Sequence, residues 1–404
     1  MKLLMITHGI SMANSTIALR VAKEWSETGH ESWVLGATPT QECPESAALH
    51  FAGGVQDTSA SDRFVALCGG AGASPGRKLR CALAHPVCAW HTYVTQTTAA
   101  YNRRLCRQAV RLCRENGIDC AVVLSLPFVP AQLLCGRLPC RLALYQVDPY
   151  ALAADLTPAQ RAPRIAEERA VFEHCAHIFT TPLLLAEYEV TELAAYAPKM
   201  TAVEFPCIVD LAGDGRDDFV YPEGAVVGVY AGTLASDIRN LDCMESVLDA
   251  AFSQMPQLCV RFIGKRFYGA MEKLVRKWPG RVFLSDRMDR CDANAAMQRA
   301  DFLINIGFNV FNQLPSKTLD YISTGKPIVN FYELPHCPTL PYMEKYPHAL
   351  CLDFAADAQE SAARLVEFCR SLPDAAVPFA EVERLFWDGT PQAVAQQIVK
   401  KLSD

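Results

Sequence analysis

Several patterns that mark common classes of protein are missing from this sequence. The 17 cysteines include no C-x-x-C pair, which excludes the closely spaced ligands of a zinc module. The most apolar stretch, residues 121–145, is interrupted by Pro127, Pro130, Gly136 and Arg137, so no segment qualifies as a membrane-spanning helix. An excess of positive charge is missing too. The formal net charge is -6, which argues against nucleic-acid binding driven by phosphate neutralisation.

The composition is that of a large globular protein. Its 404 residues are 50% hydrophobic and 20% charged, which favours two domains with sizeable cores. The cysteines are scattered from Cys43 to Cys369 and are expected to be reduced, small apolar core residues. Residues 1–6 predict a buried strand rather than a signal peptide. We therefore expect a cytoplasmic protein, at most peripheral at the inner face of a membrane.

Short apolar runs alternate with helical patterns along nearly the whole chain, which is typical of α/β folds with doubly wound parallel sheets. Strands are predicted at 3–7, 32–35, 121–125, 142–146, 178–180 and 201–204, and then at 226–231, 259–263, 282–284, 302–306 and 328–331. Between the two sets, Phe205 to Gly224 is polar and Asp-rich, with Pro206 and Pro222 near its ends. This segment is predicted to connect two α/β units.

Arginines gather on one predicted helix, after a segment at 61–98 that is expected to form a partly helical surface insertion. Arg103, Arg107, Arg111 and Arg114 follow one another at spacings of four, four and three, so they share one helix face. An ordinary solvated face explains this pattern. A surface for anionic lipid headgroups or for an anionic acceptor explains it as well.

The first predicted strand leads into a small polar loop, 7–16, with several hydroxyls and a single glycine. This loop matches neither the G-x-G-x-x-G dinucleotide pattern nor a P-loop. Ligands of open α/β sheets bind beyond the carboxyl ends of the strands, so Gly9 and its small neighbours would let a ligand approach closely. His8 either takes part in chemistry there or merely satisfies a local backbone group.

The most informative stretch is 305–329 in the second half. It predicts a buried strand ending at Gly307, a polar loop, and a helix that begins at Pro315 and ends before Gly325 at its C′ position. Amides near Ser316 and the Lys317 ammonium would meet a phosphate group.

One turn further along that helix, the Asp320 carboxylate would accept hydrogen bonds from the two hydroxyls of a ribose. Together with the residues before it, this predicts a cradle for a nucleoside diphosphate built without a P-loop. An ordinary proline-started helix on a surface loop is the alternative explanation of the same pattern.

These residues resemble a known family. Leu314-Pro315-Ser316-Lys317, then Asp320-Tyr321 and Gly325-Lys326-Pro327-Ile328-Val329, are similar to the nucleotide-sugar motif of GT-B glycosyltransferases, in particular the family-4-like group. Other stretches agree with the family in order: Glu27 to His30, Glu167 to Thr181, Val229 to Leu234, and Ile238 to Asn240. The resemblance covers most of the chain apart from the region around 61–98.

The resemblance implies two Rossmann-like domains that face a central cleft. The first, 1–205, would lie on the acceptor side, the second, 206–385, would bind the nucleotide sugar, and a terminal helix at 386–404 would cross back to the first. The activity implied is transfer of a sugar from a UDP- or GDP-linked donor to a glycan, glycolipid or other hydroxyl acceptor, with no metal and no further cofactor. Synthesis of a cell-surface polysaccharide is the expected setting.

The family pattern also implies roles for particular residues. Arg239 and Lys317 would stabilise the departing diphosphate, with Lys265 as a supplement; Arg266 is expected to be a solvated cation. The residues implied to bind the donor are Gly232, Thr233, Lys265, Asn312, Leu314, Pro315, Ser316 and Asp320. Asn312 departs from the family, which carries an acid at this position, and an amide supplies no negative charge beside an oxocarbenium-like centre.

On the acceptor side, Asp148 would orient or deprotonate a hydroxyl, unless it belongs to a plain Asp-Pro turn. His8 is the second catalytic candidate, and the acceptor would meet Gly9, Ser11, Asn14 and Tyr150. No metal site is predicted, because His174 and His177 have no acidic partner on their helix face. The alternatives to a transferase are a sugar-nucleotide epimerase of the same fold and a catalytically silent protein that binds nucleotide sugars.

Overall fold

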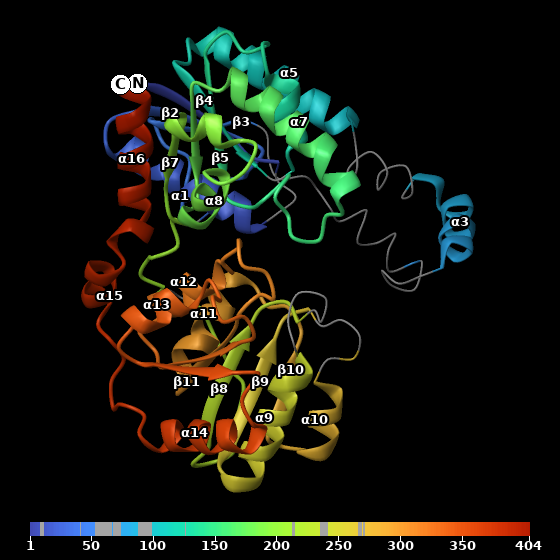
Figure 1. Cartoon of the computed structure of the whole chain (residues 1–404), viewed down its shortest axis with the longest axis vertical. Helices are drawn as coiled ribbons and strands as arrows, with labels where there is room; N and C mark the ends of the chain where they lie inside the picture. The colour runs from blue at the N-terminus through green and yellow to red at the C-terminus, as the bar shows by residue number, and fades with distance from the viewer. Residues whose placement is uncertain are drawn as a thin grey trace. The chain divides into compact units, whose positions relative to one another are not determined.

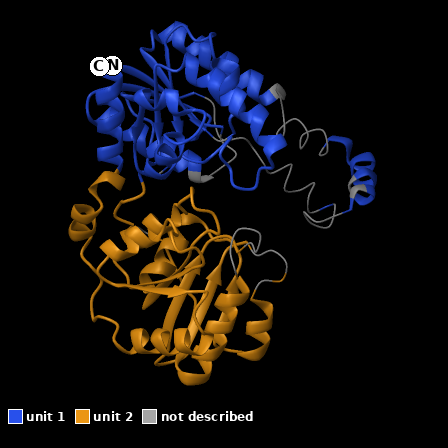
Figure 2. Cartoon of the chain, in the orientation of Figure 1, with its two compact units in different colours: residues 1–206, 391–404 blue, residues 207–390 orange. Residues whose placement is uncertain are grey.

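The computed structural model describes residues 1–8, 12–40, 42–52, 67, 74–87, 99–125, 127–211, 215–234, 241–265, 269 and 271–404. The chain forms two compact units (Figure 2). Unit 1 contains Met1–Pro206 together with Pro391–Asp404, and unit 2 contains Cys207–Thr390. Unit 2 is therefore inserted between two segments of unit 1.

Unit 1 is built on a sheet of seven parallel strands in the order β3-β2-β1-β4-β5-β6-β7 (Figure 1). The strands are β1 (Lys2–Ile6), β2 (Glu31–Leu35), β3 (Leu49–Ala52), β4 (Cys120–Ser125), β5 (Arg141–Gln146), β6 (His177–Thr180) and β7 (Met200–Ala202). The central strands are apolar along almost their whole length because helices cover both faces of the sheet.

The helices of unit 1 connect these strands and close the chain. They are α1 (Met12–Glu27), α3 (Pro75–Ala84), α5 (Ala99–Asn116), α6 (Val129–Leu134), α7 (Pro158–His174), α8 (Pro182–Tyr188), the short 3-10 helix η1 (Ala194–Lys199) and α16 (Pro391–Ser403). The fully buried Trp25 of α1 donates its indole N–H to the Ala395 carbonyl of α16 at 3.3 Å. The terminal helix thus packs on the first unit, as predicted.

Unit 2 repeats the scheme with six parallel strands in the order β10-β9-β8-β11-β12-β13. These are β8 (Val226–Ala231), β9 (Leu258–Ile263), β10 (Val282–Ser285), β11 (Phe302–Ile306), β12 (Ile328–Tyr332) and β13 (Ala349–Asp353). Its helices are α9 (Leu241–Gln254), α10 (Glu272–Lys277), α11 (Arg290–Arg299), α12 (Lys317–Ser323), α13 (Leu340–Lys345), α14 (Ala358–Arg370), α15 (Phe379–Leu385) and the 3-10 turn η2 (Trp387–Gly389). The prediction of two doubly wound parallel sheets is confirmed.

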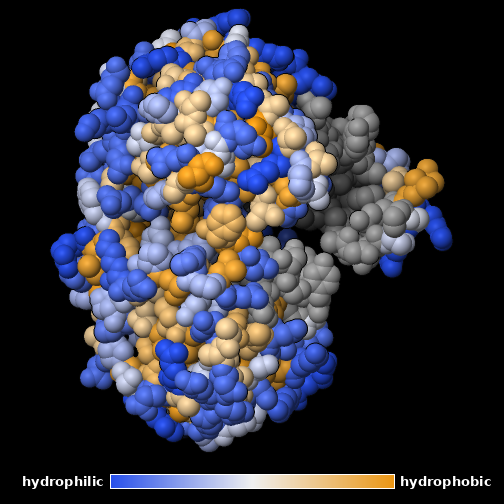
Figure 3. All heavy atoms as spheres, viewed as in Figure 1, coloured by the Kyte–Doolittle hydropathy of each residue, from blue (hydrophilic) through white to orange (hydrophobic). Residues whose placement is uncertain are grey.

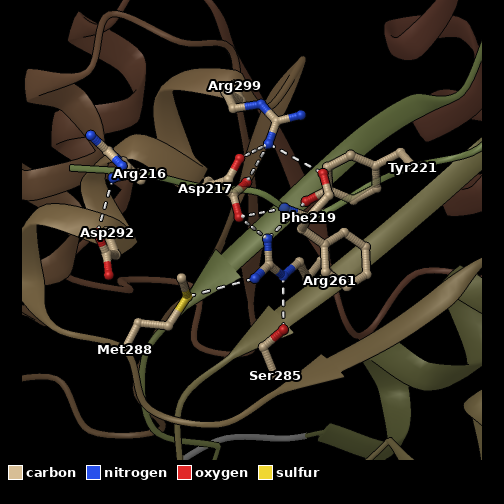
Figure 4. A network of polar contacts seen from close by, with 9 residues as sticks. All are labelled: Arg216, Asp217, Phe219, Tyr221, Arg261, Ser285, Met288, Asp292 and Arg299. Atoms are coloured by element: carbon tan, nitrogen blue, oxygen red, sulfur yellow. Dashed lines mark hydrogen bonds and ion pairs between the residues drawn. The ribbon is translucent and has the colours of Figure 1, made fainter.

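The segment expected to connect the domains is, in its second half, an anchored part of unit 2 (Figure 4). The buried Asp217 carboxylate pairs with Arg261 of β9 at 2.7 Å and with Arg299 of α11 at 3.1 Å. The Arg261 guanidinium also lies over the Phe219 ring at 4.2 Å and donates to the Ser285 hydroxyl at 2.8 Å. A polar stretch that reads as a linker therefore fixes β9, β10 and α11 to one another.

Helix α3, within the predicted insertion, carries apolar side chains on the surface (Figure 3). Leu79 and Leu83 expose 64% and 75% of their surface. The described cysteines are free thiols and most of them are buried, in agreement with the expectation of small apolar core residues. In the part of the chain that the structure describes, no helix has the length and apolarity needed to cross a membrane.

Candidate functional site

The predicted donor residues of unit 2 follow three adjacent strands. Lys265 comes after β9, Gly232 and Thr233 come after β8, and the loop 307–316 comes after β11. The chain runs from β8 outward to β9, whereas β11 lies on the other side of β8, so the sheet reverses its winding between β8 and β11. Ligands of open parallel sheets bind at the carboxyl edge of such a switch point. The structure thus brings these residues to one edge of one sheet.

Two glycines allow the strand-end loops to approach each other closely at this edge. A Cβ on Gly264, which has φ +131, would lie 2.2 Å from the Gly232 carbonyl oxygen. Backbone hydrogen bonds of 2.9 Å join Gly232 to Ile263 and Leu234 to Lys265. The two loops are therefore held together by backbone atoms, and no side chain at Gly232 or Gly264 blocks a ligand that approaches them.

The loop after β11 ends in a tight turn that starts α12. The sequence predicts the helix to begin at Pro315, but it begins at Lys317, and Ser316 is its N-cap without a side-chain cap bond. The reason is that the Thr318 amide donates to the Pro315 carbonyl at 2.9 Å, which makes the first turn a tighter i to i+3 turn. The predicted end is confirmed, since Gly325 follows the C-cap with φ +70.

Three charged side chains meet at the first turn of α12. The Asp320 carboxylate lies 3.3 Å from the Lys317 ammonium and 3.6 Å from the Arg290 guanidinium. Its side chain is 13% exposed, whereas those of Lys317 and Arg290 are 43% and 39% exposed. Two solvent-accessible cations thus share one nearly buried carboxylate, which leaves the cluster with a net positive charge.

Arg290 is absent from the residues predicted from the sequence. It is the first residue of α11, directly after the N-cap Asp289, and α11 follows β10. The first residues of a helix that follows a parallel strand lie at the carboxyl edge of the sheet. The sequence could therefore have indicated that Arg290 lies at this edge. Its pairing with Asp320 could not be predicted, because the two residues are far apart in the sequence.

Buried polar contacts hold α12 against the sheet. The Tyr321 hydroxyl donates to the Ala231 carbonyl at 3.1 Å and accepts from the Ala231 amide at 2.9 Å, at the end of β8. Thr318 donates to Asn305 of β11 at 3.4 Å. Tyr321 and Thr318 are fully buried, so the helix that carries Lys317 and Asp320 is fixed in place.

The remaining predicted donor residues differ in their accessibility. Thr233 and Lys265 are exposed, and Ser316 is half-buried. Asn312 and Leu314 expose only 2% and 4% of their surface, so these two side chains are buried beneath the accessible surface of the sheet edge. Four predicted positions, Arg239, Arg266, Gly9 and Ser11, lie outside the described residues.

In unit 1, His8 directly follows the end region of β1 and is held by α5. Its Nε2 lies 2.8 Å from the Asn102 amide oxygen, and the Tyr101 hydroxyl donates to the His8 carbonyl at 2.8 Å. Because an amide oxygen can only accept, Nε2 carries the proton and Nδ1 keeps its lone pair. Burial lowers the pKa of His8 and so favours the neutral ring. The hydrogen bond with Asn102 has the opposite, smaller effect on the pKa. Asn14 on α1 is buried as well.

The loop after β5 carries Asp148 and Tyr150, which the sequence places near the acceptor. Asp148 is half-buried. The Tyr150 ring stacks on Phe128 with 4.3 Å between centroids, and its hydroxyl donates to the Glu167 carboxylate. Burial and this carboxylate raise the pKa of Tyr150 to about 12. In this structure the Tyr150 hydroxyl holds the loop to α7.

A buried carboxylate accepts a hydrogen bond from the same loop. Glu168 of α7 is fully buried, and its Oε1 accepts from Gln146 at 2.7 Å, from Tyr188 at 2.9 Å and from the Ala151 amide at 3.3 Å. Burial raises the pKa of Glu168 to about 6, although the hydrogen bonds oppose the shift. The loop that carries Asp148 therefore rests on a carboxylate that titrates near neutral pH.

Replacing Glu168 by Gln is expected to change the pH dependence of stability. The folded protein binds the Glu168 proton more tightly than an unfolded chain, whose pKa is near 4.5. The stabilisation from this group is therefore complete below about pH 4.5 and is lost as the pH rises through about 6, a difference of about 2 kcal/mol. Relative to wild type, E168Q should gain about that much stability between pH 4.5 and 7.5. Urea unfolding at both pH values measures it, with the exposed Glu192→Gln as control. Parallel pH profiles for wild type and E168Q would contradict the assignment.

The histidines and acidic side chains of the described residues are candidate metal ligands. Among the described residues, no group of three or more His, Cys, Asp or Glu side chains is placed to hold a metal ion. His174 contacts the Ala170 carbonyl and His177 contacts the Thr201 hydroxyl, so each has a local partner.

Comparison with known proteins gives the fold. No family model matches the chain, and no curated protein matches it. A glycosyltransferase from Rickettsia africae superimposes with a TM-score of 0.63 at 8% identity, over 100% of this chain and 97% of that one. Anabaena HepE, solved with UDP and glucose, gives 0.59 at 12% identity over the whole of both chains. A putative UDP-N-acetylglucosamine 2-epimerase from Listeria monocytogenes gives 0.58 at 11% identity, over 98% and 94%.

These structures superimpose on nearly the whole of this chain, although they differ from it in almost all residues. The resemblance to the family-4-like group stays a prediction, since no comparison reaches that level. The sheet topology and the structural likenesses together show that the chain has the GT-B fold.

Proposed function

We propose that this protein is a glycosyltransferase that moves a sugar from a nucleoside-diphosphate sugar to a hydroxyl of a glycan or glycolipid. The observation that carries the proposal is the cluster of Lys317, Asp320 and Arg290 at the switch point of unit 2. It lies on the same sheet edge as the bare backbone at Gly232 and Gly264. Assembly of a cell-surface polysaccharide is the setting that we infer from the sequence resemblance.

The cluster matches two parts of a nucleoside diphosphate, the diphosphate and the ribose. The accessible ammonium of Lys317 and guanidinium of Arg290 attract the diphosphate, and Asp320 accepts from the ribose hydroxyls. As the bond to the sugar breaks, negative charge grows on the diphosphate, so the same cations stabilise the transition state. We assign Arg239 and Lys265 as supplementary cations. On this proposal the reaction needs neither a metal nor a further cofactor.

We assign the acceptor site to unit 1 because this unit carries two side chains that could act as a base. Burial lowers the pKa of His8 and so favours the neutral ring, whose Nδ1 lone pair suits a base for an acceptor hydroxyl. Asp148 is the second base candidate, on the loop that Glu168 supports.

A sugar-nucleotide epimerase is the second candidate, because solved neighbours of both names share this fold. A silent binding protein is the third, since Asn312 supplies no carboxylate. The three differ in what they do to a bound sugar nucleotide, whereas all require binding of a nucleoside diphosphate.

The test is calorimetry with UDP, GDP, dTDP and ADP, followed by NMR of the matching sugar nucleotides in D2O with EDTA. A transferase releases the nucleoside diphosphate in proportion to the acceptor added. Without acceptor, it releases the nucleoside diphosphate slowly, by transferring the sugar to water. An epimerase exchanges a sugar C–H for deuterium and inverts that carbon, and a silent protein leaves the bound sugar nucleotide unchanged. Failure of all four nucleotides to bind would overturn the proposal.

A further inference from the structure

Helix α5 of unit 1 borders a groove of about 940 Å³ that the predicted donor and acceptor residues do not line. One wall is α5 and the other is the turn after α6. Five arginines line it: Arg103, Arg107, Arg111, Arg114 and Arg137. The first four are the arginines whose shared helix face the sequence predicts. Arg137, which comes from the opposite wall, turns that face into a recess.

The groove concentrates positive charge on a protein that is acidic as a whole. Its four helical arginines extend over about 16 Å at the rise of an α-helix. The one acidic side chain in the lining is Glu115, and its carboxylate pairs with Arg111 at 2.8 Å. A ligand that matches this groove is elongated and carries several negative charges, because a single anion would meet the row at one point.

The shape of the groove and the packing of α5 favour a narrow chain over a flat membrane. The apolar side chains Leu105, Ala109 and Cys113 of α5 are buried in the core of unit 1, so this helix has no free apolar face to insert into a bilayer. Between the arginines, Cys106 and Val110 also line the recess. A mixed lining of guanidinium and apolar groups suits sugar rings that bear anionic substituents.

The row of arginines begins beside the candidate base. Asn102 and Tyr101, in the first turns of α5, hold His8 by hydrogen bonds of 2.8 Å each. Arg103 is the next residue, and the other arginines follow along the helix away from His8. A chain that lay in the groove would therefore have one end near His8.

We propose that this groove binds the anionic body of a chain-like acceptor, a glycan that carries carboxylate or phosphate groups along its length. The inference rests on the proposed transferase function, to which it adds the class of acceptor. Guanidinium groups bind such anions by paired, charge-assisted hydrogen bonds.

The experiment measures binding of fluorescently labelled oligogalacturonates of increasing length by anisotropy. Affinity should rise with length until the row of arginines is covered, and neutral maltooligosaccharides of the same lengths should not bind. The triple variant R107Q/R111Q/R114Q should lose at least tenfold in affinity. Glu115→Gln removes the competing carboxylate and should strengthen binding a few-fold. The control is Arg276→Gln, an exposed arginine of unit 2, which should change nothing.

Two results would overturn the inference: no binding of any oligogalacturonate, or equal binding by the triple variant. In the first case, the proteins are also tested for capture by phosphatidylglycerol–phosphatidylcholine vesicles that depends on these arginines. Such capture would assign the groove to a membrane surface. Nucleotide calorimetry on the same variant separates the two proposals. If the triple variant loses oligosaccharide binding but keeps nucleotide binding, the result supports the groove as the oligosaccharide site. If wild type binds oligosaccharide through these arginines but binds no nucleotide, the proposed transferase function fails and the anion-binding groove remains.

Discussion

Replacing Lys317 by Gln is expected to weaken binding of a nucleoside diphosphate about 10- to 100-fold. The Lys317 ammonium is 43% exposed and lies at the start of α12, so a diphosphate at the sheet edge would contact it directly. Loss of one hydrogen bond to a charged group costs about 1.5–3 kcal/mol, which gives this range. Where turnover is measurable, kcat should fall further than binding, because charge on the leaving diphosphate is largest in the transition state.

The matched control is Lys273→Gln, which removes an exposed lysine of the same unit from α10. It should leave nucleotide affinity unchanged. Both variants should melt near the wild-type temperature, because both lysines are accessible to solvent and Arg290 still faces Asp320 when Lys317 is replaced. Lys317 also faces Asp320, so D320N is measured alongside to separate loss of the cation from release of its carboxylate partner. Equal nucleotide affinity for K317Q and wild type would remove Lys317 from the site.

Replacing Asp217 by Ala is expected to destabilise unit 2 by about 3–5 kcal/mol. The Arg261 side chain that it neutralises is 4% exposed, so the variant would leave a buried guanidinium without its carboxylate. For a domain of this size the loss corresponds to a drop of about 10 °C in melting temperature. Scanning calorimetry measures it, and the effect should fall on the transition of unit 2.

Burial, rather than distance, produces this large effect. Glu381 and Arg384 form an ion pair of the same 2.7 Å length, but their side chains are 42% and 67% exposed. Glu381→Gln should therefore leave the melting temperature of unit 2 nearly unchanged. The double variant D217L/R261M should recover much of the loss, because it removes both charges together. A similar small cost for both single variants would show that Arg261 is reached by solvent.

The fold could be predicted well from the sequence because most strands are buried on both faces and appear as short apolar runs. The strands β8 and β11 have the predicted bounds, and most of the others differ by one residue at an end. The two strands that were missed, β3 and β13, lie at sheet edges and are mostly half-buried. An edge strand needs a less continuous apolar run, so its pattern resembles that of a loop.

The contacts of the candidate site could be predicted where they are local in sequence, and were missed where they depend on tertiary structure. Lys317 and Asp320 share one helix turn, so their proximity follows from helix geometry. Arg290 reaches Asp320 from another helix, and the Tyr150 hydroxyl is taken up by Glu167 of α7. No spacing rule along the chain expresses such pairings. The helix start at Lys317 rather than Pro315 is a difference of another kind, because a local hydrogen bond from the Thr318 amide to the Pro315 carbonyl decides it.

The insertion of unit 2 between two segments of unit 1 has a consequence for biosynthesis. Trp25 of α1 is fully buried and donates a hydrogen bond to α16, and α16 leaves the ribosome after all of unit 2. Domains generally fold as units while the chain is being made. The second unit can therefore reach its native state while the first still exposes the α1 surface around Trp25. Nascent chains stalled before residue 391 should present that surface to chaperones, and release of the last helix should remove it.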